Sequence, residues 1–77
     1  EYDTPERLIL KDEIQATIAR AIDTLPDDLK TAITLRELEG MSYEEIAQTM
    51  ECPIGTVRSR IFRARDAIDN MLKPLLK

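Results

Sequence analysis

The sequence contains no histidine, and Cys52 is its only cysteine. The lack of histidine excludes a Ser-His-Asp triad. With a single cysteine, an internal disulfide and a zinc site of the usual Cys/His kind are excluded as well. Glycine occurs twice, and aromatic residues make up 4% of the chain. An all-β sandwich or barrel needs more of both, since strands favour aromatic and β-branched residues and their turns favour glycine.

Long apolar runs are missing too. No run approaches about 18 residues, so we expect no membrane span, and no signal peptide is visible. The 77 residues, 43% hydrophobic and 34% charged, suit one small globular domain. The unpaired Cys52 fits a reducing compartment. Because the chain begins at Glu1 rather than Met, we expect it to be a fragment of a longer protein.

A basic segment lies within an acidic chain. The formal net charge of -4 by itself disfavours binding to nucleic acid. Residues 53–73, however, carry five basic and two acidic side chains, a local charge of +3, whereas the remaining residues carry six basic and thirteen acidic ones. Because salt screens charges more than about 10 Å away, the local charge decides whether a polyanion binds. The acidic remainder is either ordinary solvated helix surface or a face for a basic partner.

The apolar periodicity predicts a first helix from about residue 5 to 24. Thr4 is its cap and Pro5 its first residue, so residues 1–4 are expected to be the end of a linker and residues 5–77 one domain. Apolar residues recur along it at helical spacing, namely Leu10, Ile14, Ile18, Ile22 and Leu25.

Proline and glycine delimit the second helix. Pro26 ends the first helix and opens the second, and Gly40 follows as the stop signal. Asp27 and Asp28 lie in its first turn, where the helix dipole favours acids. Its buried side is expected to contain Leu29, Ala32, Ile33 and either Leu35 or Leu38.

Two shorter signals place the third and fourth helices. Ser42, followed three residues later by Glu45, is a capping box that opens a short third helix. Pro53 fits the first position of a fourth helix, which runs to about Leu72 because Pro74 prevents its extension. The inward residues of the third helix are Ile46, Ala47 and Met50, and those of the fourth are Val57, Ile61, Ala64 and Ile68.

A joint of about three residues between these two helices indicates a helix-turn-helix, whose helices cross near a right angle. Ala47 and Val57 lie ten positions apart, where the two helices touch, and the small Ala47 side chain allows close approach. Two departures weaken the pattern: the turn favours glycine where Glu51 stands, and the next core residue is Ile61 rather than residue 60. The predicted fold class is an all-α, four-helix domain that contains a helix-turn-helix and ends in a long recognition helix.

The outward side of the fourth helix carries the candidate DNA-reading residues. Phe62 beside exposed arginines has no packing role within one small domain, but in a major groove its ring meets a thymine methyl group. Arg63 can donate two hydrogen bonds to guanine, and Ser59 can bond a base edge or a phosphate. The competing interpretation is a solvated face whose arginines pair with Asp66 and Asp69.

Other basic and polar residues are candidates for the sugar-phosphate backbone. The arginines that flank the buried stripe can grip phosphates, and the start of the third helix is expected to cross the backbone. Adjacent acids such as Glu44 and Glu45 do not face each other on a helix, so we predict no catalytic pair and no enzyme. The candidate backbone contacts are Arg58, Arg60, Arg65, Thr56, Ser42, Tyr43, Lys30 and Arg36.

These residues resemble region 4 of bacterial extracytoplasmic-function sigma factors, of the sigma-E/AlgU type. The resemblance spans residues 5–77, and its most specific segment is CPIGTVRSRIFRARDAID, residues 52–69. It implies that the last helix reads the promoter minus-35 element, and it places Arg58, Ser59, Phe62 and Arg63 at the groove-facing positions.

The resemblance also implies partners. Region 4 of such factors docks on the flap of the RNA polymerase β subunit, and a membrane-anchored anti-sigma factor masks it, which links envelope stress to transcription. It implies a bacterial cytoplasmic location and no cofactor. Region 2, which melts the minus-10 element, is absent from this sequence, so the chain alone is not expected to direct initiation. Two alternatives remain open: the output domain of a LuxR/NarL-like response regulator, and a module that binds only protein.

Overall fold

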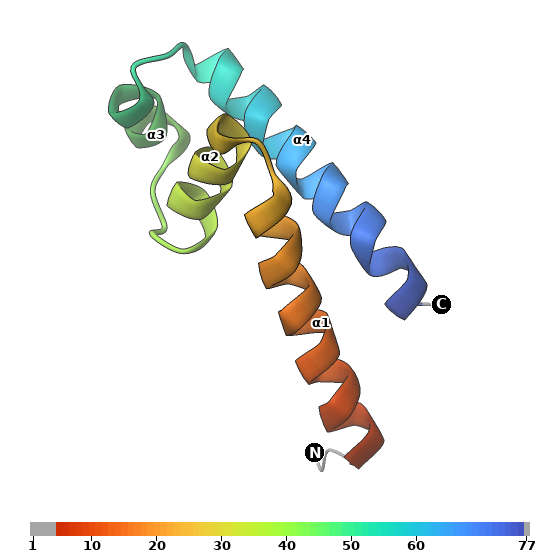
Figure 1. The fold of residues 1–77 in the computed structure, drawn as a ribbon. Helices are drawn as coiled ribbons and strands as arrows, with labels where there is room; N and C mark the ends of the chain where they lie inside the picture. The colour runs from red at the N-terminus through yellow and green to blue at the C-terminus, as the bar shows by residue number, and fades with distance from the viewer. Residues whose placement is uncertain (1–4, 77) are drawn as a thin grey trace.

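The computed structural model describes residues 5–76, which form four α-helices and a short 3-10 helix, with no strand among them. The helices are α1 (Pro5–Thr24), α2 (Asp27–Glu37), α3 (Tyr43–Met50) and α4 (Ile54–Leu72), and η1 (Lys73–Leu75) follows. The all-α, four-helix prediction is confirmed, while the expected linker at residues 1–4 lies outside the described residues. Helices α2 and α3 gather at one end of the molecule, and α1 and α4 extend away from it (Figure 1).

Helix α4 is the centre of the core, because it packs against each of the other three α-helices. The predicted inward stripe is confirmed: Val57, Ile61 and Ala64 are buried, and Ile68 packs against them half-buried. Full burial of an aliphatic side chain stabilises the fold by about 1.5–3 kcal/mol, so this stripe fixes the side of α4 that faces inward. The buried partners from the other segments are Leu25, Ala32, Ile33 and Ile46.

The expected apolar stripe of α1 reaches the core only near the C-terminal end of the helix. Leu10, the first residue of this stripe, is 40% exposed and does not pack against the core. The reason is geometric: the N-terminal half of α1 extends beyond α2 and α3, and residues 5–13 are all exposed (Figure 1). The buried residues within α1 are Thr17 and Ala21. The isoleucines of the stripe, Ile14, Ile18 and Ile22, are half-buried.

The connection from α2 to α3 settles which leucine faces inward. Leu35 packs half-buried against the core, whereas Leu38 is 71% exposed. Gly40 follows with a φ of +70°, a left-handed conformation that glycine adopts without steric cost. The stop signal at Gly40 is therefore confirmed, although α2 itself ends three residues earlier, at Glu37.

The predicted capping box opens α3. The Ser42 hydroxyl accepts a hydrogen bond of 3.1 Å from the Glu45 backbone N–H, and the Glu45 carboxylate accepts one of 2.8 Å from the Ser42 N–H. Both bonds satisfy backbone donors that the first turn of a helix leaves free. Ile46 is buried, and Ala47 and Met50 pack against the core, as expected.

The turn between α3 and α4 forms without the glycine that such turns favour. Glu51 adopts a left-handed conformation, with φ 54° and ψ 53°, which costs a residue with a Cβ atom about 1–2 kcal/mol. The next residue, Cys52, donates its backbone N–H to the Ala47 carbonyl at 3.0 Å. Closure of the turn and burial of the core on both sides of it offset the local strain.

The start of α4 differs by one residue from the prediction. Pro53 is not the first helical residue but the N-cap, in an extended conformation with ψ 151°. Its carbonyl accepts hydrogen bonds from the N–H groups of Thr56 and Val57, at 3.0 and 3.2 Å. Proline suits either position because it lacks an N–H donor, so the sequence could not separate them.

Candidate nucleic-acid interface

The outward side of α4 presents the predicted set of reading side chains to solvent. Arg58, Ser59, Phe62 and Arg63 are all exposed. The Phe62 ring is 72% exposed, the largest value among the large apolar side chains that are described. Exposing an aromatic ring has no benefit to folding, whereas a nucleic-acid groove can cover it.

A hollow of about 490 Å³ lies along the first half of α4. Ser59 and Arg63 line it together with the backbone candidates Thr56 and Arg60. The structure therefore brings four predicted site residues to one concave surface. Arg58 and Phe62 do not line it, and at 100° per residue they project from the opposite flank of α4. The other lining residues are Asp28, Pro53 and Gly55.

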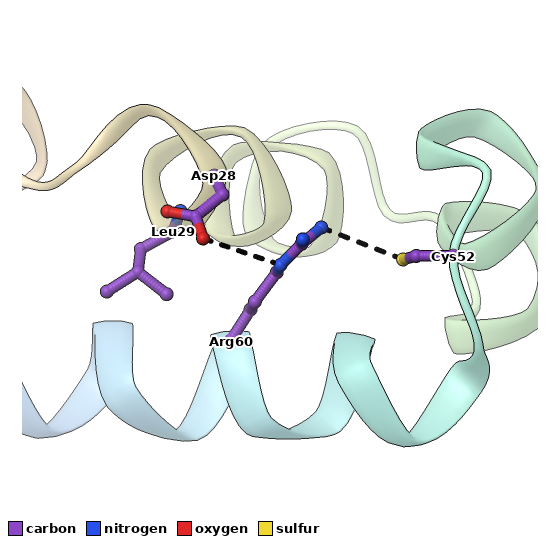
Figure 2. A network of polar contacts seen from close by, with 4 residues as sticks. All are labelled: Asp28, Leu29, Cys52 and Arg60. Carbon is purple, nitrogen blue, oxygen red and sulfur yellow. Dashed lines mark hydrogen bonds and ion pairs between the residues drawn. The ribbon is translucent and has the colours of Figure 1, made fainter.

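The four arginines of α4 fall into two pairs. Arg60 is engaged within the protein: its Nε lies 3.6 Å from Oδ2 of Asp28, and its Nη1 donates to Sγ of Cys52 at 3.7 Å (Figure 2). Arg65 donates from Nη2 to Oε2 of Glu37 at 2.6 Å. Both acids belong to α2. In the described part of the chain, Arg58 and Arg63 form no ion pair.

The competing interpretation is that the outward side of α4 is a solvated face whose arginines pair with Asp66 and Asp69. These contacts do not agree with that pairing. Within residues 5–76 the ion pairs of the α4 arginines go to α2, and none goes to Asp66 or Asp69. The Glu37 hydrogen bond is the main cause that raises the pKa of Arg65, with added attraction from the Glu37 charge and from Tyr43. The guanidinium of Arg65 is therefore cationic at every accessible pH.

The remaining backbone candidates also have partners within the protein. Lys30 pairs with Asp23 at 3.6 Å. Arg36 donates from Nη1 to the Met41 carbonyl at 2.8 Å and lies over the Tyr43 ring, 5.0 Å from its centroid. Ser42, as described, caps α3. These residues lie outside the hollow, and their contact with phosphates stays a prediction.

Three partners of the α4 arginines were not predicted from the sequence, namely Asp28, Glu37 and Cys52. In the sequence, Asp28 stands out only as a first-turn acid and Cys52 only as an unpaired cysteine. Their partners on α4 become neighbours only once α2 crosses it. No local signal in the sequence marks such pairs.

The described residues hold neither a metal cluster nor an unsatisfied buried polar group. Among residues 5–76, no three His, Cys, Asp or Glu side chains gather closely enough to hold a metal ion. Every buried side-chain nitrogen or oxygen atom in this range has a hydrogen-bond partner. None of the described helices has the length and apolar character needed to cross a membrane.

The chain matches a known protein family. The model of the family described as Sigma-70, region 4, matches residues 15–68, which include α2, α3, the turn that follows and most of α4. The chain belongs to the sigma-70 region 4 family. The family match therefore favours the sigma-factor interpretation over the response-regulator alternative.

Similar proteins carry sigma-factor names. Region 4 in this chain is 62% identical over 77 residues to the RNA polymerase sigma-H factor of Pseudomonas aeruginosa. It is 60% identical over the same length to the ECF RNA polymerase sigma-E factors of Salmonella typhimurium and Escherichia coli K12. Each match covers 100% of this chain and 40% of the relative. The chain thus spans about two fifths of the length of these relatives.

Proposed function

We propose that this domain binds the minus-35 element of promoter DNA in a sequence-specific manner, as the region 4 of a sigma factor that directs RNA polymerase to envelope-stress-type promoters. The observation that carries the proposal is the outward face of α4, where the exposed Phe62 ring stands beside two arginines without ion-pair partners among the described residues. The proposed role is binding, without catalysis or a cofactor.

We assign base readout to the exposed side chains of α4 that have no other role in the described fold. Arg63, at the hollow, donates to the two acceptors of a guanine, and Ser59 one turn before it bonds a base edge. Phe62 covers a thymine methyl group from the other flank, where Arg58 reaches the same groove. The core stripe of α4 determines which side chains project outward, so the packing itself presents this set.

Contact with the sugar-phosphate backbone is assigned to the start of α4. This helix has no acid in its first turn and no side chain that caps it, so its free N–H groups can meet a phosphate. Helices α2 and α3, in contrast, each carry two acids in the first turn. Thr56 lines the hollow beside this terminus and can add a hydroxyl contact.

We also propose that a separate surface serves the protein partners, the flap of the RNA polymerase β subunit and an anti-sigma factor. An apolar groove of about 350 Å³ lies where α1, α2 and α4 meet. The groove reaches α4 at Arg65, Ile68 and Asp69, whereas the hollow lies along residues 53–63, and no residue lines both, so both surfaces can be occupied together. This arrangement suits a factor of the bacterial cytoplasm that bridges polymerase and promoter. The groove is lined by Ile18, Ile22, Ile33, Glu37, Leu38, Arg65, Ile68 and Asp69.

The test is fluorescence anisotropy of the 77-residue chain with two duplexes, one with a sigma-E-type minus-35 element and one with the same bases scrambled. The proposal predicts tighter binding to the first duplex and a 5- to 150-fold loss with Arg63→Ala, equivalent to about 1–3 kcal/mol. Lys11→Ala is the control, because it removes one positive charge from the exposed half of α1. Equal binding to both duplexes supports instead the module that binds only protein.

A further inference from the structure

The side chain of Arg60 is enclosed within the domain although it lines the DNA-facing hollow. Only 24% of it is exposed, compared with 49% for Arg65. Figure 2 shows the guanidinium reaching from α4 toward the first turn of α2, between the Asp28 carboxylate and the Cys52 sulfur. Its two contacts, at 3.6 and 3.7 Å, join α4 to α2 and to the α3–α4 turn.

The Asp28–Arg60 contact is one of two ion pairs that join α2 to α4, and the other is Glu37–Arg65. Asp28 and Glu37 lie near opposite ends of α2, and Ile33 between them is buried in the core. Their partners Arg60 and Arg65 are five positions apart, which places them about 140° apart around α4. Helix α2 therefore contacts α4 through ion pairs on both of its flanks, and these two contacts resist rotation of α4 about its own axis.

Rotation of α4 determines where its reading side chains point. Ser59 precedes Arg60 in the chain, and Arg63 follows it by three positions, so both lie within one turn of the held residue. All three line the hollow. A small rotation would move the donor atoms of Arg63 away from the two guanine acceptors, because bidentate hydrogen bonds tolerate little misalignment.

We propose that Arg60 is a positioning residue for DNA readout: paired with Asp28 and bonded to Cys52, it holds α4 against small rotations within the orientation that the core stripe fixes, and so maintains the aim of Ser59 and Arg63. This inference rests on the proposed function. The Asp28–Arg60 pair is close to neutral, and a phosphate that approached Arg60 would meet the Asp28 carboxylate. The pair is therefore a poor phosphate site, and we assign Arg60 to positioning instead of the backbone contact expected from the sequence.

The decisive variant is Asp28→Asn. If charge alone matters, loss of a carboxylate beside the hollow strengthens binding to any DNA, and it frees Arg60 for a phosphate. If Arg60 positions α4 through Asp28, the ratio of affinities for the minus-35 and scrambled duplexes falls about tenfold, as when one bidentate base contact is loosened. Asp27→Asn is the matched control, because it removes the same charge one residue away and should preserve the ratio.

A second variant separates positioning from phosphate contact through salt dependence. Arg60→Gln should lower the affinity ratio while it leaves the slope of log affinity against log salt unchanged, whereas a lost phosphate contact reduces that slope by about 0.9. The double variant D28N/R60Q should lower the ratio no further than either single variant, since both act through one pair. Circular dichroism at the assay temperature shows that each variant is folded.

The outcomes are distinct. If the wild-type chain separates the two duplexes and Asp28→Asn lowers the ratio while Asp27→Asn does not, the positioning role is supported. If the wild-type chain separates them but Asp28→Asn tightens binding like Asp27→Asn, or Arg60→Gln reduces the salt slope by about 0.9, positioning is overturned and the proposed function stands. If the wild-type chain binds both duplexes equally, the proposed function fails and the positioning role fails with it.

Discussion

Arg65 on α4 and Glu37 at the end of α2 are joined by a hydrogen bond of 2.6 Å between Nη2 and Oε2. The two residues lie 28 positions apart in the chain, and each side chain is 49% exposed. The bond closes the flank of the apolar groove, since both residues line it. Helix α4 is thus tied to α2 through a residue that does not line the hollow along its first half.

Glu37→Gln should lower the free energy of unfolding by about 0.2–1 kcal/mol, the usual contribution of an exposed ion pair. The loss should shrink in 1 M salt, because salt screens exposed charges. Urea unfolding at low and high salt measures both effects. Glu39→Gln, at an exposed position of the α2–α3 connection, is the control for charge loss alone.

The pH dependence of this pair follows from the raised pKa of Arg65. A base whose pKa is raised by folding stabilises the protein fully below its unfolded pKa, and this contribution is lost only as pH rises through the folded value. Both values lie far above neutrality for arginine. From pH 6 to 9, therefore, the Arg65 side of the pair should add no slope to the unfolding free energy. A titration-like step in that range that disappears with Arg65→Gln would contradict this.

Much of the helical fold could be predicted because its signals are local. The Ser42–Glu45 capping box and the inward stripe of α4 each lie within one helix, and both were confirmed. The exposure of Leu10 could not be predicted, since the helical period reports a shared face but not whether anything packs against it. The choice between Leu35 and Leu38 likewise depended on the direction in which the chain leaves α2.

The candidate site was predictable in part for the same reason. The residues that face outward on α4 can be predicted because the core stripe occupies the other side of the helix. The contacts of Arg60 and Arg65 depend on how α2 crosses α4, which no sequence spacing reports. Their expected role at the phosphates could therefore be proposed from charge alone, but their partners Asp28, Glu37 and Cys52 emerged only from the structure.

Phe62→Ala should separate folding from binding. Because the ring is 72% exposed, its loss should change the unfolding free energy by no more than about 0.5 kcal/mol. Affinity for the minus-35 duplex should nonetheless fall, since the contact with a thymine methyl group is lost. Anisotropy and urea unfolding of the same preparation measure the two effects. A large loss of stability with unchanged DNA affinity would show that the ring serves packing.

Glu51→Gly should stabilise the domain. The left-handed backbone at φ 54° is strained for glutamate and free of strain for glycine, so relief of about 1 kcal/mol is expected. Glu44→Gly, within α3, should instead destabilise by about 1 kcal/mol, because glycine is a poor helix former. Thermal unfolding of the two variants gives shifts of opposite sign if this account of the turn is right. Destabilisation by both variants would show that Glu51 contributes through its side chain.

Ser42→Ala removes one half of the capping box and should cost about 0.5–2 kcal/mol of unfolding free energy. The measurement is urea unfolding, with Ser59→Ala as the control, since Ser59 is exposed on α4 and no bond of its hydroxyl is seen among the described residues. Equal effects of the two substitutions would contradict the capping role.

The most direct test of the central claim, that the outward face of α4 reads DNA, is a map of backbone amide chemical shifts during titration with the minus-35 duplex. The account predicts the largest changes at Thr56, Ser59, Phe62 and Arg63, with residues 5–13 of α1 unchanged. Changes centred instead on the apolar groove, at Ile18, Ile22 and Leu38, would contradict it and assign nucleic-acid contact to that groove.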